Sequence, residues 1–161
     1  MNKLKGALIL FVIFIASICC SFYFDESYRK LIRHLYVVLS NGKISFFIQK
    51  LYLHFPGAAF VLSSGLFMIT LIFLAYRQTT KQQVVNIAFG LLLFFASILT
   101  QSYLDSFFII VECTACSDGT IKLNYSDISY DLIFISSLLL AIIPVATTEV
   151  KKFIKRKKEQ G

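Results

Sequence analysis

The sequence predicts an all-α membrane protein with four transmembrane helices and both termini in the cytoplasm. Two observations favour this fold class. Hydrophobic residues make up 57% of the chain and charged residues only 16%, which leaves too little polar surface for an ordinary soluble domain. The apolar residues also gather into four runs, each about as long as the roughly 20 helical residues that cross a bilayer core.

The four runs give the expected spans in chain order. Helices are predicted over about 6–24, 55–76, 84–105 and 129–148. The first run follows two lysines, as in a signal peptide, but its long apolar core and the lack of an A-x-A site favour an uncleaved helix. No polar interval is long enough for a soluble domain, so residues 1–161 are expected to form a single transmembrane domain with a basic cytoplasmic tail at 149–161.

The charges beside the spans predict their orientation. Lys and Arg precede the first run, occur in the short link at 77–83 and are clustered in the tail. The positive-inside rule assigns these three segments to the cytoplasmic side of a bacterial inner membrane. The segment from Glu112 to Asp127 holds three acids against one lysine, so it is expected outside. This placement explains the net charge of +7 through contact with membrane lipids, and no nucleic acid partner is expected.

Both outer loops are expected to be ordered. In the first, 25–54, apolar residues at helical spacing on either side of Asn41-Gly42 predict two amphipathic helices on the periplasmic membrane surface, with a re-entrant or spanning pair as the alternative. This loop also carries five cations on the side where the rule predicts few. In the second loop, strand formers before a turn at 116–119 and an alternating stretch after it predict a short β-hairpin over 106–126.

Cys113 and Cys116 form the one motif that suggests redox chemistry. Three interpretations remain open: a local structural disulfide, a bond to Cys19 or Cys20, or catalysis in the manner of membrane thiol oxidases of the DsbB type. Catalysis is disfavoured because the first outer loop has no cysteine and nearby acids raise the pKa of a thiol. Nucleotide-binding, hydrolase and metalloprotease motifs are absent, so no enzyme, cofactor or metal site is expected.

Polar residues inside the spans are the other candidates for function, since each is costly unless it faces protein or water. Ser97, Gln101 and Asp105 recur at i, i+4 spacing along the third span, and Asp131 lies near the outer end of the fourth. Packing between the protein's own helices is one interpretation, and binding another protein's helices in the membrane is the other. Ionisable groups occur only near the outer boundary, which disfavours a channel or transporter.

The stretch before the fourth span resembles a known family. The matching residues are Glu112, Thr114, Ala115, Gly119, Lys122 and Leu123. Together with the size, the four-span layout and the basic tail, they resemble the immunity proteins for pore-forming colicins of the colicin A and B type. The resemblance implies an inner-membrane protein that binds the hydrophobic hairpin of a bacteriocin's pore domain before the channel opens.

On this hypothesis the chain acts by binding a toxin within the membrane. Residues expected to contact the partner are Gln101, Asp105, Glu112, Thr114, Lys122 and Asp131. The alternatives are a thiol oxidase that uses Cys113 and Cys116, and a non-catalytic accessory subunit of a larger membrane complex.

Overall fold

The computed structural model describes the chain except for residues 1–2, 48–56, 76–77, 114–118 and 160–161. The described residues are mostly helical. They form the helices α1 (Lys3–Leu39), α2 (Ala58–Ala75), α3 (Thr80–Glu112) and α4 (Tyr130–Glu159), the short strands β1 (Ile44–Phe46) and β2 (Ile121–Leu123), and a 3-10 turn (Tyr125–Asp127).

Three helical segments among these residues are long and apolar enough to cross a membrane. They are Phe11–Leu39, Thr80–Glu112 and Tyr125–Lys158. α2 is a shorter apolar helix that coincides with the second predicted span. The structure thus has the helices of a multi-pass membrane protein, while the number of spans and their orientation stay predictions.

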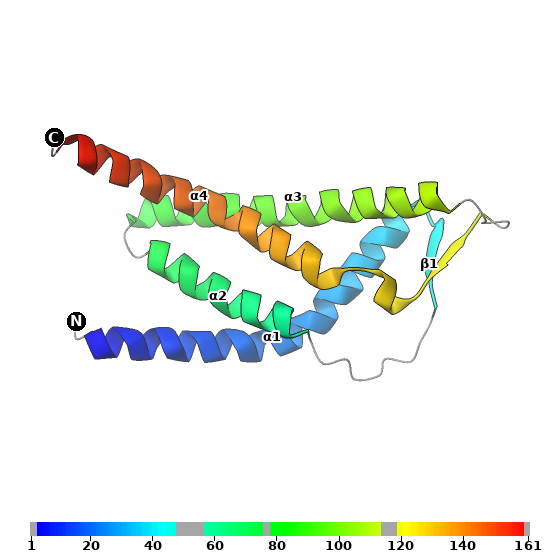
Figure 1. Ribbon diagram of the computed structural model, residues 1–161, viewed down its shortest axis with the longest axis horizontal. Helices are drawn as coiled ribbons and strands as arrows, with labels where there is room; N and C mark the ends of the chain where they lie inside the picture. Colours follow the sequence, from blue (N-terminus) through cyan, green and yellow to red (C-terminus); the bar gives the residue numbers. More distant parts are fainter. Residues whose placement is uncertain (1–2, 48–56, 76–77, 114–118, 160–161) are drawn as a thin grey trace.

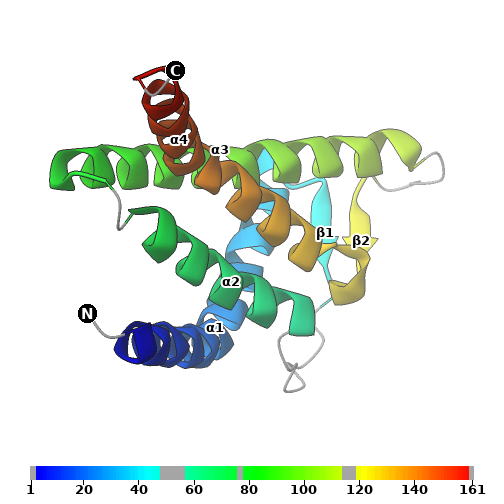
Figure 2. The same ribbon diagram turned by 60° about the vertical axis from the view of Figure 1, so that its left-hand side comes forward.

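The helices form an elongated bundle in which α4 runs diagonally across α3 (Figure 1). α2 packs between α1 and α4, and the two chain termini lie at the same end of the bundle (Figure 1). α1 changes direction midway, so that its second half passes behind α4 and reaches the far end of α3 (Figures 1 and 2). All four helices therefore meet near the second half of α1.

The core lies at this meeting point. Its buried side chains include Tyr28, Ile32 and Tyr36 of α1, Phe60 of α2, Ile98 of α3 and Ile133 of α4. Away from it, every helix exposes large apolar side chains, among them Phe11, Phe22, Leu66, Leu92, Phe108 and Leu139. Apolar surface this extensive is typical of helices whose outer faces contact lipid, because a water-facing surface would expose less of it.

The first outer loop departs from its prediction. The residues expected to form its first amphipathic helix continue α1 without a break, and their apolar face packs into the core instead of lying on the membrane surface. No Pro or Gly separates the first span from this stretch, and two i, i+4 ion pairs, Asp25 with Arg29 and Glu26 with Lys30, support the continuous helix. The helix ends where Asn41 and Gly42 take positive φ values of 52° and 76°.

The remainder of that loop also differs from expectation. Its second predicted amphipathic helix begins with residues that form β1, and the rest of the predicted helix lies largely outside the described residues. The apolar spacing therefore does not give a helix at Ile44 to Phe46, the part of the predicted helix that forms β1. Ile44 is fully buried, which explains why this stretch is apolar.

The predicted β-hairpin is not formed by the described residues. Its first arm is helical as far as Glu112, where α3 ends, and residues 116–118 of its turn lie outside the description. The second arm is β2, which pairs in parallel with β1: Ile121 N donates to Lys43 O at 2.7 Å and Phe47 N donates to Leu123 O at 3.2 Å. Parallel strands need a long connection, so this pair ties the two predicted outer loops together.

Candidate functional site

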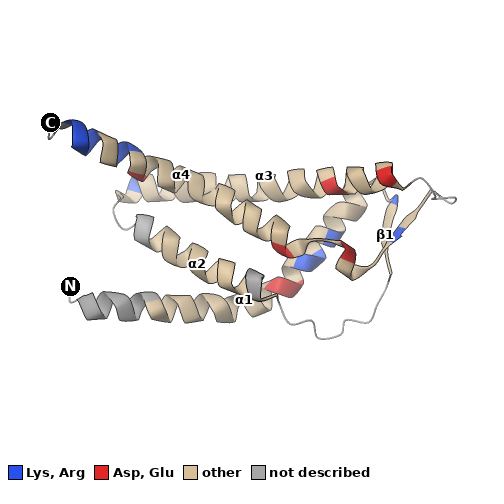
Figure 3. Ribbon diagram, viewed as in Figure 1, with Lys and Arg blue, Asp and Glu red and all other residues tan. Residues whose placement is uncertain are grey.

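Charged side chains gather at the two ends of the bundle. Figure 3 shows Lys and Arg along the last turns of α4, and a mixed group of acids and cations where α1, α3, α4 and the strands meet. Between them the described helices carry uncharged side chains (Figure 3). An uncharged middle zone is what a bilayer core requires, since an ionised group there costs several kcal/mol, about 2.5–3.5 on insertion scales.

Arg29 is the centre of the mixed group. Its Nε donates to both carboxylate oxygens of Asp25 at 2.9 Å, and its Nη2 donates to Asp131 of α4 at 3.3 Å. The guanidinium also lies 4.9 Å from the ring centroid of Tyr130. Arg29 and Asp25 are 6% and 4% exposed, so the charges stabilise each other in a site with little access to solvent.

Asp131 extends this junction to a third helix. A Cβ at Gly57, the residue before α2, would collide with the Asp131 carboxylate, so this carboxylate lies against the start of α2. A negative charge near a helix N-terminus is favourable because the backbone N–H groups there lack helical partners. Asp131, predicted to bind a partner, is thus placed where α1, α2 and α4 meet.

The other cations of the same stretch also have contacts within the chain. Lys30 pairs with Glu26 at 2.6 Å, and the guanidinium of Arg33 lies 4.5 Å from the ring centroid of Tyr125. Together with the Arg29 junction, these contacts give Arg29, Lys30 and Arg33 partners within the chain.

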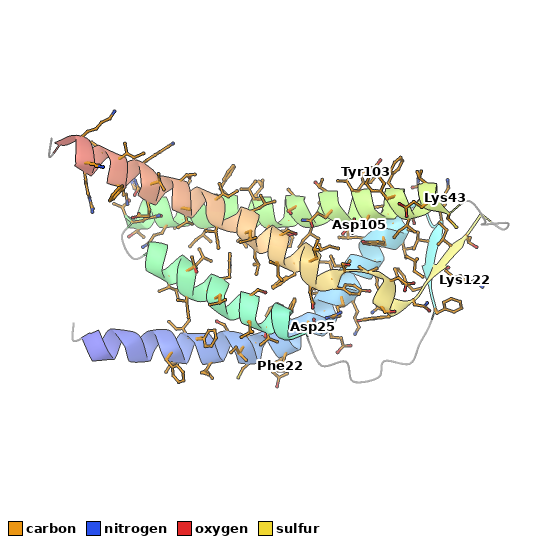
Figure 4. The ribbon with its side chains drawn as sticks, in the orientation of Figure 1. Phe22, Asp25, Lys43, Tyr103, Asp105 and Lys122 are labelled. Atoms are coloured by element: carbon orange, nitrogen blue, oxygen red, sulfur yellow. The ribbon has the colours of Figure 1, made fainter. Side chains whose placement is uncertain are left out.

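Asp105 connects α3 to α1. Its carboxylate accepts a hydrogen bond from the hydroxyl of Tyr36 at 3.0 Å, and Tyr36 is almost fully buried. Figure 4 shows Asp105 on the side of α3 that the second half of α1 approaches, with Asp25 nearer the N-terminal half of α1. The contact satisfies a buried phenol, so Asp105 also has a role inside the bundle.

Gln101 joins α3 to α4. Its Nε2 donates to Ser97 Oγ at 2.6 Å and to Ser137 Oγ at 3.4 Å, and its Oε1 accepts from Ser136 at 2.7 Å. Ser137 Oγ donates in turn to Ser97 Oγ at 3.1 Å. The predicted stripe on the third span thus lies along a seam between the protein's own helices, as the helix-packing interpretation expected.

The remaining predicted contacts lie at the strand end of the molecule. Glu112 is exposed at the end of α3, and Lys122 is exposed on β2 with its Nζ 5.9 Å from the ring centroid of Phe47 (Figure 4). Thr114 lies outside the described residues. The structure therefore separates the predicted set: Gln101, Asp105 and Asp131 hold helices together, while Glu112 and Lys122 face outward.

The cysteines fall into two groups. Cys113 is disulfide-bonded, whereas Cys19 and Cys20 are free and exposed on α1. A bond from Cys113 to α1 is thereby excluded. Cys116, the other cysteine of the motif, lies outside the described residues.

An apolar groove runs between α1 and the other helices. It has a volume of about 700 Å³, and one wall is the face of α1 that carries Ala16, Ser17, Cys20 and Ser21. The hydroxyls of Ser17 and Ser21 donate to carbonyls of their own helix at 2.8 and 2.7 Å, so neither hydroxyl donates into the groove. The opposite side is largely aromatic and includes Phe60, Phe94, Phe95 and Phe134.

The sequence analysis did not identify this groove. Its signal was present, because Ala16 with Cys20 and Ser17 with Ser21 are small residues at i, i+4 spacing, the pattern that lets transmembrane helices approach closely. Across the groove, this face of α1 is met by side chains of α2, α3 and α4, among them Phe60, Phe94 and Phe134. Among the described residues, no group of three or more His, Cys, Asp or Glu side chains is arranged to hold a metal ion.

Comparisons with protein-family models, with curated proteins and with solved structures gave no match for this chain.

Proposed function

We propose that this chain is an inner-membrane immunity protein that binds the pore-forming domain of a colicin-type bacteriocin within the membrane and blocks channel opening. The observation that carries the proposal is the apolar groove beside α1, which has walls suited to an apolar helix and lies within the apolar helical segments. The hydrophobic hairpin of a pore domain has the chemistry to occupy such a groove. The resemblance around Glu112 to Lys122 supports the same function.

The proposed topology has four spans with both termini in the cytoplasm. α2 has 18 residues, about 27 Å at 1.5 Å per residue, which is close to the roughly 30 Å of a bilayer core. The two termini lie at the same end of the bundle, and the cations of the α4 tail lie there too (Figures 1 and 3). Both features agree with the positive-inside rule.

The predicted partner-binding residues then take two roles. Gln101, Asp105 and Asp131 position the helices that form the groove, and Glu112 and Lys122 are exposed for contact with the part of the toxin outside the membrane. Thr114 belongs to the same outer contact. Recognition through shape and a few polar contacts is what specificity between related toxins requires.

The decisive experiment is to express the chain in sensitive bacteria and challenge them with a panel of pore-forming colicins. Survival against at least one of them is expected, with sensitivity to nuclease colicins unchanged. Killing by every pore-forming colicin at a verified expression level would contradict the proposal.

Two neighbouring cysteines provide a matched test of the groove. Cys20 lines it and Cys19 does not, although both are exposed and free. Cys20→Phe places a ring in the groove, so we expect at least a ten-fold loss of protection, whereas Cys19→Phe is expected to protect like the unmodified chain. Equal protection by both variants would place the toxin contact elsewhere.

A further inference from the structure

The C-terminal part of α4 continues beyond the packed bundle. The helix has 30 residues, about 45 Å at 1.5 Å per residue, which exceeds the roughly 30 Å of a bilayer core by about ten residues. Near the start of this part, Thr148 accepts a hydrogen bond from Asn86 of α3 at 3.1 Å. Figure 2 shows the end of α4 standing clear of the other helices.

This extension has an amphipathic composition. Val150, Phe153 and Ile154 share one face by their i, i+3, i+4 spacing, and they are 55%, 69% and 50% exposed. All positions from 151 to 158 except Phe153 and Ile154 are Lys or Arg. The acids nearby are Glu149, which pairs with Lys152 at 3.2 Å, and Glu159, so the segment 149–161 has six cations against two acids.

We infer that the segment from Val150 to Lys158 is an interfacial helix that binds anionic phospholipid headgroups. An exposed aromatic and two aliphatic side chains beside clustered cations are the pattern of helices that lie in the headgroup layer. The segment continues an apolar helix long enough to cross a membrane, so its cations lie within a few turns of the headgroups. Clustered cations next to a transmembrane helix attract anionic lipid over the range of the Debye length.

Lipid fits these observations better than a soluble polyanion. A nucleic acid would pair with the cations but would leave Phe153 and Ile154 in water, whereas the boundary between headgroups and acyl chains accepts both kinds of side chain. This inference does not depend on the proposed function, because it concerns the end of α4 and not the groove.

The chain has no tryptophan, so Phe153→Trp introduces a single fluorescent reporter at the proposed contact. The full-length variant would be placed in nanodiscs of phosphatidylcholine, with or without one quarter phosphatidylglycerol. We expect a blue shift of the emission and stronger quenching by brominated acyl chains in the anionic discs. The response should be largely lost at 1 M salt, where the Debye length falls to about 3 Å.

Charge removal provides the second measurement. In the Phe153→Trp background, Lys151→Gln, Arg156→Gln and Lys158→Gln should each lower the ratio of lipid-bound to free helix by about five-fold at low salt. Lys122→Gln removes an exposed cation far from this segment and should leave the response unchanged. Phe22→Trp, an exposed position on the apolar part of α1, should give the same emission in both kinds of disc.

Equal emission of the Phe153→Trp reporter in neutral and anionic discs would overturn the inference. So would a salt-dependent change on adding RNA to neutral discs without any change caused by phosphatidylglycerol, which would identify nucleic acid as the partner. Resistance of the anionic response to all three charge substitutions would also contradict it, because the contact would then be apolar only.

Discussion

The two sides of the bundle are held together by different forces. Between α3 and α4, polar side chains form hydrogen bonds in the middle, around Gln101, and again closer to the start of α3, where Asn86 donates to Thr148 at 3.1 Å. The first half of α1 meets α2 through apolar contacts, such as the ring of Phe14 against Gly65, and leaves the groove open.

This difference matters because lipid tails are as apolar as the side chains they replace. Apolar contacts between helices in a membrane therefore gain little over contact with lipid, while interhelical hydrogen bonds contribute about 0.6–2 kcal/mol each. α3 and α4 are expected to form a fixed frame. The groove side of α1 is the surface on which an incoming helix can replace lipid at small cost. Three substitutions are expected to distinguish the fixed contact of α3 with α4 from the adaptable α1 side.

The largest effect is expected at the junction of α1, α2 and α4. Arg29→Met leaves the buried Asp25 without its cation and removes the contact to Asp131, so we expect a loss of about 3–5 kcal/mol in the free energy of unfolding. Lys30→Met is the control, because its pair with Glu26 is exposed and is expected to contribute less than about 1 kcal/mol. Unfolding in mixed detergent micelles measures both. Similar losses for the two variants would show that the Arg29 junction is not a structural centre.

An intermediate effect is expected from a pair of glycines that compares the two sides directly. A Cβ at Gly90 would lie 2.7 Å from the backbone oxygen of Ala141 on α4, whereas a Cβ at Gly65 would meet the ring of Phe14, a side chain that can move. Both substitutions to Ala gain similar helix propensity. We expect Gly90→Ala to destabilise the protein by about 1–3 kcal/mol through overpacking and Gly65→Ala to be nearly neutral. Comparable unfolding free energies would remove the distinction between a fixed seam and an adaptable side.

The helices were predictable from sequence because a membrane-spanning backbone must satisfy its own hydrogen bonds, so a long apolar run leaves little choice but helix. The same rule explains the failed hairpin. Phe107 to Val111 are strand formers by propensity, yet they continue α3, because propensity is weak beside the surroundings of the chain. The partner of Ile121 is Ile44, far away in sequence, and no local pattern indicates it.

The stretch after the first span shows a different limit. A surface helix and a helix packed in a core have the same periodicity, so the spacing of Tyr28, Ile32 and Leu35 predicted a helix correctly and its location wrongly. Charge spacing does not identify its location either, because Asp25 with Arg29 and Glu26 with Lys30 share the i, i+4 spacing, yet only the first pair is buried. The groove depends on the direction that α1 takes after its first half, which no sequence pattern specified.

The smallest of the three effects is expected in the seam itself. Gln101→Leu removes the contacts to Ser97, Ser136 and Ser137, but the serines keep other acceptors, since Ser137 Oγ also donates to the carbonyl of Ile133 at 2.7 Å. A loss of about 1 kcal/mol in the unfolding free energy is therefore expected. Thr100→Val is the control, because the exposed hydroxyl of Thr100 bonds only within α3 among the contacts described.

If Gln101 instead contacts a toxin directly, Gln101→Leu should abolish protection while leaving the unfolding free energy as in Thr100→Val. The structure favours the opposite result. A modest loss of stability with protection retained would identify Gln101 as a residue of the frame, because a frame held by several hydrogen bonds tolerates the loss of one side chain. Protection would then depend on the shape of the groove beside α1, which the frame positions without contributing its own polar groups to the bound helix.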